Sequence, residues 1–272
     1  MRLPGADSLR HFLLALQFFT RIPVTGRLAA WVGYSPAMLN ASSGHFPGVG
    51  WVVGLWSAAC MGLGLMLLPA TLPGLLAAAV LATAGSVWLT GGFHEDGLAD
   101  MADGLGGSAG RERAMQIMKD SRIGSYGTLA LMLALALKLA LLALLAERGT
   151  GLALTALLTA HVLSRLAPLV VMHRLPYVSE DSVSKSKPLA ETVSPASFVW
   201  AAVWSVPALA LLLASHGMAQ AVAALLLQGL VLLACLRLLR RRLQGFTGDT
   251  LGAVQQLGEL AIYLGLALHI GA

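Results

Sequence analysis

The sequence predicts an all-α protein, a polytopic membrane helix bundle with about seven transmembrane helices and an interfacial N-terminal helix. Of its 272 residues, 57% are hydrophobic and only 11% are charged, whereas about 25% of an average soluble domain is charged. The mean hydropathy is +0.76. Several apolar runs reach the roughly 20 residues that a helix needs to cross the hydrocarbon core of a bilayer.

The first apolar segment, residues 9–19, is too short to span a bilayer, so we expect an interfacial or buried helix that ends before Pro23. Longer apolar runs follow, separated by turns or polar segments. We find no internal repeat and treat residues 1–272 as a single integral membrane domain. The seven candidate spans are residues 49–68, 71–92, 128–146, 151–172, 198–215, 218–236 and 251–271.

The connections between these runs alternate between short turns and long polar segments. With seven spans, the long segments 93–127, 173–197 and 237–250 lie on the same side as the N-terminus. Of the 18 Lys and Arg residues, all but Lys138, Arg148 and Arg165 fall on that side. Cytoplasmic loops carry an excess of Lys and Arg, so we expect these segments to face the cytoplasm. This orientation explains the net charge of +5 better than nucleic-acid binding, because the basic residues are scattered.

The segment GGFHEDGLADMADGLGG, residues 91–107, concentrates carboxylates in an otherwise apolar chain. On a helix, Asp96, Asp100 and Asp103 share one face, where like charges repel unless a cation neutralises them. Grouped hard oxygen ligands suit Mg²⁺ or Mn²⁺, particularly when phosphate adds further oxygens. Glu95 points about a quarter-turn away and is a weaker member. His94 is a candidate ligand or base, or alternatively an interfacial hydrogen-bonding residue. For the whole segment, the alternative is a solvated acidic loop.

A basic stretch, RERAMQIMKDSRIGSYG, follows the acidic one. Within it, Lys119 and Arg122 flank Asp120 and Ser121. An Arg side chain presents a fork that suits phosphate oxygens, and Lys presents a point charge. An acidic cluster followed by cations on the same face is what a metal–phosphate site requires. The alternative is ordinary basic charge in a cytoplasmic loop.

Several polar residues lie in or beside the later apolar runs. Arg165 lies about two-thirds along a span, where it needs a carboxylate, a phosphate or a polar cavity as partner. Asp249 precedes the last span and is a candidate metal ligand, a candidate for binding a substrate hydroxyl, or a helix N-cap. Glu259 lies within that span, one turn after Gln255, and an acidic residue there suggests a functional role. The sequence offers no partner for Lys138.

Three long motifs, FHEDGLADMADGLGG, IMKDSRIGSYG and GFTGDTLGAVQQLGE, closely resemble the cobalamin synthase family, also called adenosylcobinamide-GDP ribazoletransferases. The shorter segments QFFTRIPV and SKSKPLAETV are similar to the family as well. The resemblance runs in order over nearly the whole chain. The sequence departs from the family at His45, where a tyrosine-like aromatic is more usual, and at Gly48, where a bulkier residue is more usual.

The resemblance implies a Mg²⁺-dependent, multi-pass enzyme of the bacterial inner membrane with its active site facing the cytoplasm. The implied substrates are adenosylcobinamide-GDP and α-ribazole or its 5′-phosphate, and the products are adenosylcobalamin, or its 5′-phosphate, and GMP. The lipid bilayer is then a partner and nucleic acid is not. A homo-oligomer or a complex with other cobalamin-assembly enzymes stays open. Asp96, Asp100 and Asp103 match the acidic motif of the family by position. The basic motif is matched by Lys119, Asp120, Ser121 and Arg122, and the late TGD motif by Asp249.

On this basis, the ribazole 3′-hydroxyl is expected to attack the cobinamide-side phosphorus, and GMP leaves. Asp96 and Asp100 are the expected Mg²⁺ ligands, helped by Asp103 and Glu95. The basic motif, with Lys119 and Arg122 acting in the transition state, is expected to bind substrate phosphates together with Arg165. Asp249 is expected to bind substrate as well, through a hydroxyl group. Either Asp103 or His94 is expected to accept the hydroxyl proton.

Two other functions are compatible with parts of the sequence. DGLAD partly resembles DGxxAR, the first part of the CDP-alcohol phosphotransferase motif. However, Asp100 replaces the arginine, and the rest of that motif is absent. A cation transporter is the second alternative, and it would carry carboxylates deep within its spans near the bilayer midplane. Here the carboxylates lie at the cytoplasmic ends of the spans, beside cations, which favours phosphoryl-transfer chemistry.

Overall fold

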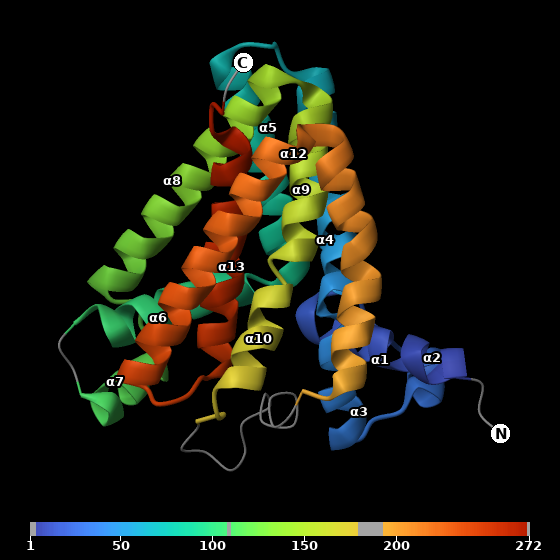
Figure 1. The fold of residues 1–272 in the computed structure, drawn as a ribbon, viewed down its shortest axis with the longest axis vertical. Coiled ribbons are helices and arrows are strands. Elements are labelled where there is room, and N and C mark those ends of the chain that lie inside the picture. The colour runs from blue at the N-terminus through green and yellow to red at the C-terminus, as the bar shows by residue number, and fades with distance from the viewer. Residues whose placement is uncertain (1–3, 108–109, 179–192, 271–272) are drawn as a thin grey trace.

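The computed structural model describes residues 4–107, 110–178 and 193–270, and the regular structure in these ranges is helical (Figure 1). The predicted all-α class is therefore confirmed. One isolated bridge, between Tyr177 and Phe246, joins two of the connecting segments. The SKSKPLAETV segment lies almost entirely outside the described residues.

The N-terminal region forms short helices that gather near one end of the bundle (Figure 1). Helix α1 spans Pro4–Phe19, and its end before Pro23 confirms the prediction for this segment. It is followed by α2 (Gly26–Val32), α3 (Pro36–Ala41) and the 3₁₀ turn η1 (Ser42–His45).

The longer helices run along the length of the molecule, and most match the predicted spans within a few residues. These are α4 (Phe46–Leu67), α5 (Leu72–Thr90), α8 (Ser125–Arg148), α9 (Thr150–Leu163) with α10 (Leu166–Arg174), α12 (Pro195–Arg242) and α13 (Gly248–Ala267). The first polar connection is itself helical and contains α6 (Phe93–Gly106) and α7 (Arg111–Met118).

Five segments of the described chain are long and apolar enough to cross a membrane, so the predicted count of seven is not confirmed. Two features explain the difference. Helix α12 contains both predicted spans, 198–215 and 218–236, and counts as one segment, although its backbone turns between them at Gly217, which has φ 80° and ψ 169°. The two halves of α12 run antiparallel in Figure 1. Helix α13 is not among the five, because Gln255, Gln256 and Glu259 lower its hydropathy.

Helix α13 is the centre of the bundle and is buried along most of its length. It packs against α12, α6 and α8 in particular. Its first turn lies beside α6, and its last turn lies at the opposite end of the bundle from α7 (Figure 1). Because its first turn carries polar groups and most of its length is buried, α13 connects the polar end of the molecule to the core.

Candidate functional site

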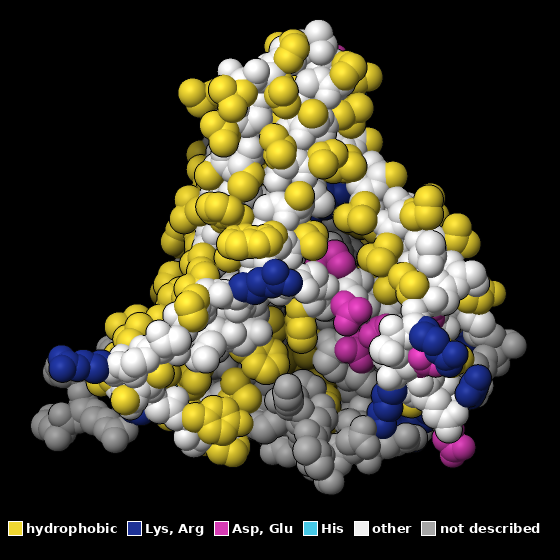
Figure 2. Space-filling view, turned by 180° about the vertical axis from the view of Figure 1, so that it is seen from behind, with side chains coloured by type: hydrophobic (Ala, Val, Ile, Leu, Met, Phe, Trp, Pro, Cys, Tyr) yellow, Lys and Arg dark blue, Asp and Glu magenta, His cyan; other side chains and the backbone are white. Residues whose placement is uncertain are grey.

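The acidic motif forms helix α6, as the spacing of its carboxylates predicts. Asp96 is exposed, and Asp100 and Asp103 are partly exposed. Figure 2 shows acidic side chains gathered in a hollow of one face of the molecule, with Lys and Arg side chains to either side. The motif therefore presents its aspartates toward solvent rather than into the apolar core.

Asp249 joins this acidic face from a distant part of the sequence. It lies in the first turn of α13, where Thr247 is the N-cap and forms a capping box with Thr250. Asp249 is therefore not the N-cap, which removes that alternative. The backbones of α6 and α13 approach so closely that a Cβ at Gly97 would lie 3.0 Å from the Asp249 Cα. This glycine allows the first turn of α13 to pack directly on the acidic helix.

The carboxylates of the acidic face affect one another's pKa values. Burial first, and then the negative charges of Asp96, Asp249 and Asp103, together raise the pKa of Asp100 to about 7. Burial also raises the pKa of Asp249, with a smaller contribution from Asp96. Within the described residues, however, no three His, Cys, Asp or Glu side chains converge closely enough to hold a metal ion. The carboxylates share one region and repel one another there.

Asp103 also connects α6 to the start of α8. Its Oδ2 accepts a hydrogen bond from the Gly124 N–H at 2.7 Å, and its Oδ1 accepts one from the Gly127 N–H at 2.8 Å. A Cβ at either glycine would contact this carboxylate at 3.0 Å or less. The GSYG segment is therefore anchored to the acidic face, and it brings the preceding basic loop beside the carboxylates.

Within that loop, Arg122 pairs with Asp120. The Arg122 Nη2 lies 2.6 Å from Asp120 Oδ2, and Nε donates to Oδ1 at 3.0 Å. Hydrogen bonds from Arg122 hold the pKa of Asp120 down at about 2. Exposed pairs of this kind contribute little to stability. Ser121 and Lys119 are exposed as well, so the loop presents its polar groups to solvent.

Glu95 points away from the acidic face, as the quarter-turn offset predicts. Its Oε1 accepts a hydrogen bond from the Gln256 side chain at 3.0 Å, and its Oε2 is buried without a hydrogen bond to any described residue. Burial raises the pKa of this carboxyl group, and the charges of Lys138 and Arg165 oppose the shift. Glu95 thus connects α6 to α13, whereas Asp96 faces solvent.

A buried polar network continues from this point into the bundle and supplies the missing partner of Lys138. The Lys138 Nζ lies 2.7 Å from Glu259 Oε1, and both side chains are at most 2% exposed. The Tyr263 hydroxyl donates to the same oxygen at 3.1 Å, and the Gln255 amide donates to Oε2 at 2.8 Å. His161 lies 3.3 Å from that second oxygen. The network links α8, α9 and α13.

Arg165 lies where α9 gives way to α10, and it is 4% exposed. Its Nη1 donates to the His161 carbonyl at 2.6 Å. We expected a carboxylate or phosphate partner, but no ion pair joins Arg165 to another described residue. The guanidinium group pairs instead with the backbone carbonyl of His161, and the Arg165 side chain lines a pocket.

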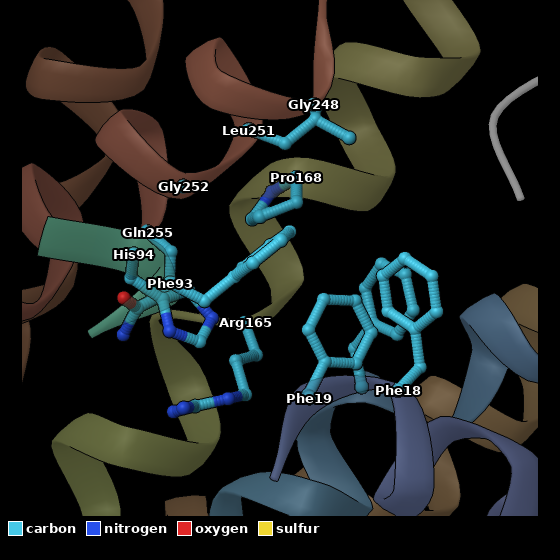
Figure 3. A pocket seen from close by; sticks show the side chains of 11 residues that line it. Phe18, Phe19, Phe93, His94, Arg165, Pro168, Gly248, Leu251, Gly252 and Gln255 are labelled. Atoms are coloured by element: carbon cyan, nitrogen blue, oxygen red, sulfur yellow. The ribbon is translucent and has the colours of Figure 1, made fainter. Parts of the chain in front are cut away.

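This pocket has aromatic walls and encloses about 520 Å³, including open space at its mouth. Phe18 and Phe19 of α1 lie on one side, and His94, Gln255 and Arg165 lie across from them (Figure 3). The His94 ring stacks on Phe19 with centroids 6.0 Å apart. Burial holds the pKa of His94 well below its usual range, so the ring is neutral. The pocket is completed by Phe46, Phe93, Pro168, Gly248, Leu251 and Gly252.

Sequence reasoning did not identify the aromatic walls of this pocket. The signal was present, because four of the seven Phe residues in the chain line it. Two of them form the pair in QFFTRIPV. Their convergence depends on how α1, α4 and α6 pack, which spacing along one helix does not specify.

The comparisons with known proteins agree over nearly the whole chain. The family model described as cobalamin-5-phosphate synthase matches residues 11–267. Proteins named adenosylcobinamide-GDP ribazoletransferase are 54% identical in Polaromonas naphthalenivorans, over 96% of this chain and 99% of the relative, and 55% identical in Albidiferax ferrireducens, over 97% and 100%. The protein of that name in Shewanella amazonensis is 46% identical over 96% of both chains. No solved structure matches. The resemblance seen in the motifs is thereby confirmed, and the chain belongs to the cobalamin-5-phosphate synthase family.

Proposed function

We propose that this protein is an adenosylcobinamide-GDP ribazoletransferase that works at the acidic face formed by α6 and the first turn of α13. One observation supports this placement most directly. The acidic motif and the TGD motif, far apart in sequence, meet where Gly97 packs on Asp249. The close relatives carry the name of this activity, and the substrates follow from that name.

In the proposed reaction, the ribazole 3′-oxygen forms a bond to the cobinamide-side phosphorus of the diphosphate. The bond from that phosphorus to the oxygen of GMP breaks, and GMP leaves with the electron pair. Lys119 and Arg122, in the loop anchored by Asp103, are proposed to neutralise the phosphate oxygens. For Arg122 this requires the exposed pair with Asp120 to open, which costs little.

The hydroxyl proton is proposed to pass to His94. Both oxygens of Asp103, the other candidate, already accept backbone N–H groups. The His94 ring is neutral, so one of its nitrogens carries a free lone pair. Burial makes this ring a weak base, but the transition state of phosphoryl transfer is loose and requires little deprotonation of the attacking hydroxyl.

The acidic face fits a divalent cation chemically. Among the described residues, Asp96 and Asp100 have no ion pair, and the neighbouring charges that act on Asp100 are all negative. Mg²⁺ prefers carboxylate and phosphate oxygens and would polarise the diphosphate. Asp96 and Asp100 are proposed to hold it together with the diphosphate oxygens of the substrate, with the Asp249 carboxylate beside them. Asp103 and Glu95 are engaged by α8 and α13 and are proposed to support that set.

We further propose that the chain crosses the bacterial inner membrane seven times. The crossings would be α4, α5, α8, α9 with α10, the two halves of α12, and α13. This arrangement places α6, α7 and residues 243–249 on one side, and the distribution of Lys and Arg favours the cytoplasm for that side. The acidic helix α6 is not among the candidate spans, which favours an enzyme over a transporter with carboxylates along its path.

The direct test uses the purified protein in lipid nanodiscs with GDP-cobinamide, α-ribazole and Mg²⁺. GMP release should require both organic substrates and should accompany a change in the corrinoid absorption spectrum. Asp96→Asn should abolish turnover, whereas Asp7→Asn, the same change on α1, should not. GMP release that is independent of ribazole would indicate a hydrolase and overturn the proposal.

A further inference from the structure

The aromatic-walled pocket takes little part in the reaction as described above, since His94 alone of its residues has a chemical role. We propose that this pocket binds the flat aromatic base of the acceptor nucleoside, which is the benzimidazole of ribazole. The inference rests on the proposed function and assigns a subsite to one of its two substrates.

The walls of the pocket suit a flat aromatic ring. Phe18 and Phe93 meet edge to face with centroids 5.9 Å apart, and Phe19 and Phe46 do so at 4.7 Å. Edge-to-face pairs leave ring faces available for a further aromatic group, which gains both buried apolar area and a favourable stacking geometry. The helices that supply these rings pack into the core through Phe19 and Phe46, so the walls are held in place.

The pocket has few polar groups, and the Gln255 side chain already forms hydrogen bonds within the protein. The Gln255 amide nitrogen donates to Ser164 Oγ and to Glu259, and its oxygen accepts a hydrogen bond from Gln256. His94 is neutral. Arg165 directs one guanidinium nitrogen to a backbone carbonyl.

Because the pocket has few polar groups, it should favour one of the two bases in the substrates over the other. Guanine carries several hydrogen-bond donors and acceptors, and burying them without partners is unfavourable. A benzimidazole joined to ribose has a single free ring nitrogen and is otherwise apolar. The pocket therefore matches the base of ribazole better than the base of the GDP-activated substrate.

The pocket lies within one helical turn of the acidic face on both helices. Gly248 and Leu251 line it and flank Asp249 in the first turn of α13. On α6, His94 lines the pocket two residues before Asp96. One turn of helix rises about 5.4 Å, a span that a ribose can bridge. A base held in the pocket would place its sugar hydroxyl beside the carboxylates.

The test compares steady-state kinetics of variants in nanodiscs. Phe18→Leu and Phe93→Leu remove aromatic faces at positions that are partly exposed, so the fold should tolerate them. Each should raise the KM for α-ribazole by roughly tenfold, because stacking of a base on one aromatic side chain contributes about that factor. The KM for adenosylcobinamide-GDP and the value of kcat should not change. Phe18→Tyr should keep the wild-type KM, since it retains the ring.

Phe198→Leu is the matched control, because Phe198 is a partly buried phenylalanine that packs on His173 outside the pocket. A raised KM for the corrinoid substrate, or an unchanged KM for ribazole in both variants, would overturn the assignment. A pocket occupied by lipid would give the second of these results.

Direct binding separates this inference from the proposed function. Equilibrium dialysis of α-ribazole against the protein, without the second substrate, should show binding that Phe18→Leu weakens and that free dimethylbenzimidazole competes away. Guanosine should not compete. If ribazole binds in this way but no GMP is ever released, the proposed function is wrong and the proposed base-binding subsite is supported. If GMP is released but binding ignores the pocket variants, the subsite fails alone.

Discussion

Asp100 is the residue whose charge is set most strongly by its surroundings. Burial first, and then Asp96, Asp249 and Asp103, raise its pKa from 3.8 to about 7. In the folded protein this group therefore binds its proton more tightly than in the unfolded chain. Folding stability should accordingly fall as the pH rises from about 4 to about 7, and it should change no further through this group above that range.

Asp100→Asn removes this unfavourable charge. The variant should gain melting temperature relative to wild type at pH 8, and the gain should be smaller at pH 5, where Asp100 in the folded state is mostly protonated. Thermal unfolding in nanodiscs without divalent cations measures the difference. Adding Mg²⁺ at pH 8 should stabilise wild type and reduce the gain. A difference that is independent of pH would contradict the position assigned to Asp100.

Single residues show where sequence reasoning succeeds and where it stops. The shared face of Asp96, Asp100 and Asp103 followed from helical spacing alone. The partner of Lys138 did not, because Glu259 lies on a different helix. The two departures from the family pattern meet at one side chain: the Trp204 Nε1 donates to His45 Nδ1 at 3.0 Å, and Gly48 leaves room for the Trp204 ring. Both positions contact the same side chain, which only the fold reveals.

At the scale of elements, the junction of α6 with α13 positions the site. Gly97→Ala should push the two helices apart, because its Cβ would meet the Asp249 backbone. We expect turnover to fall at least about tenfold, since a displacement of about 1 Å can cost a hundredfold in rate. Gly229→Ala, on α12 with open space around its Cβ, is the control and should be fully active. Equal activity of both variants in the GMP-release assay would show that the junction does not position the site.

The buried pair of Lys138 and Glu259 joins α8 to α13. Lys138→Met leaves the Glu259 carboxylate buried without its cation, so it should destabilise the protein by about 3–5 kcal/mol. The double variant Lys138→Met/Glu259→Gln should recover part of this loss, because no unpaired charge remains. Denaturant unfolding of the four proteins forms a double-mutant cycle. Additive losses in that cycle would refute the pairing.

Element types were more predictable than element counts. The apolar runs and the acidic helix α6 followed from periodicity and length. The span count was not confirmed, because α12 contains both predicted spans on either side of Gly217 and because buried polar residues lower the hydropathy of α13. Hydropathy describes a segment by itself, whereas the burial of α13 depends on the helices around it.

The whole molecule gathers its polar chemistry at one end. Reporters fused on either side of α13 test the proposed orientation. A phosphatase that is active only in the periplasm should be active when fused after Ala272 and inactive when fused after Gln244. Activity at both positions, or the reverse pattern, would contradict seven crossings with the acidic face in the cytoplasm.

The acidic face as a whole could be predicted only in part. Three of its carboxylates are neighbours on one helix, but Asp249 reaches them through the packing of α13 on α6. The aromatic pocket combines residues from α1, α4, α6, α10 and α13. Each of these contributions depends on tertiary packing.

The central claim is that this acidic face binds a divalent cation together with the diphosphate of the substrate. Electron paramagnetic resonance of Mn²⁺ with the nanodisc protein and GDP-cobinamide measures that binding directly. We predict that wild type binds Mn²⁺, that Asp96→Asn and Asp100→Asn each weaken it at least about tenfold, and that Asp7→Asn leaves it unchanged. Equal Mn²⁺ affinity in all four proteins would contradict the claim.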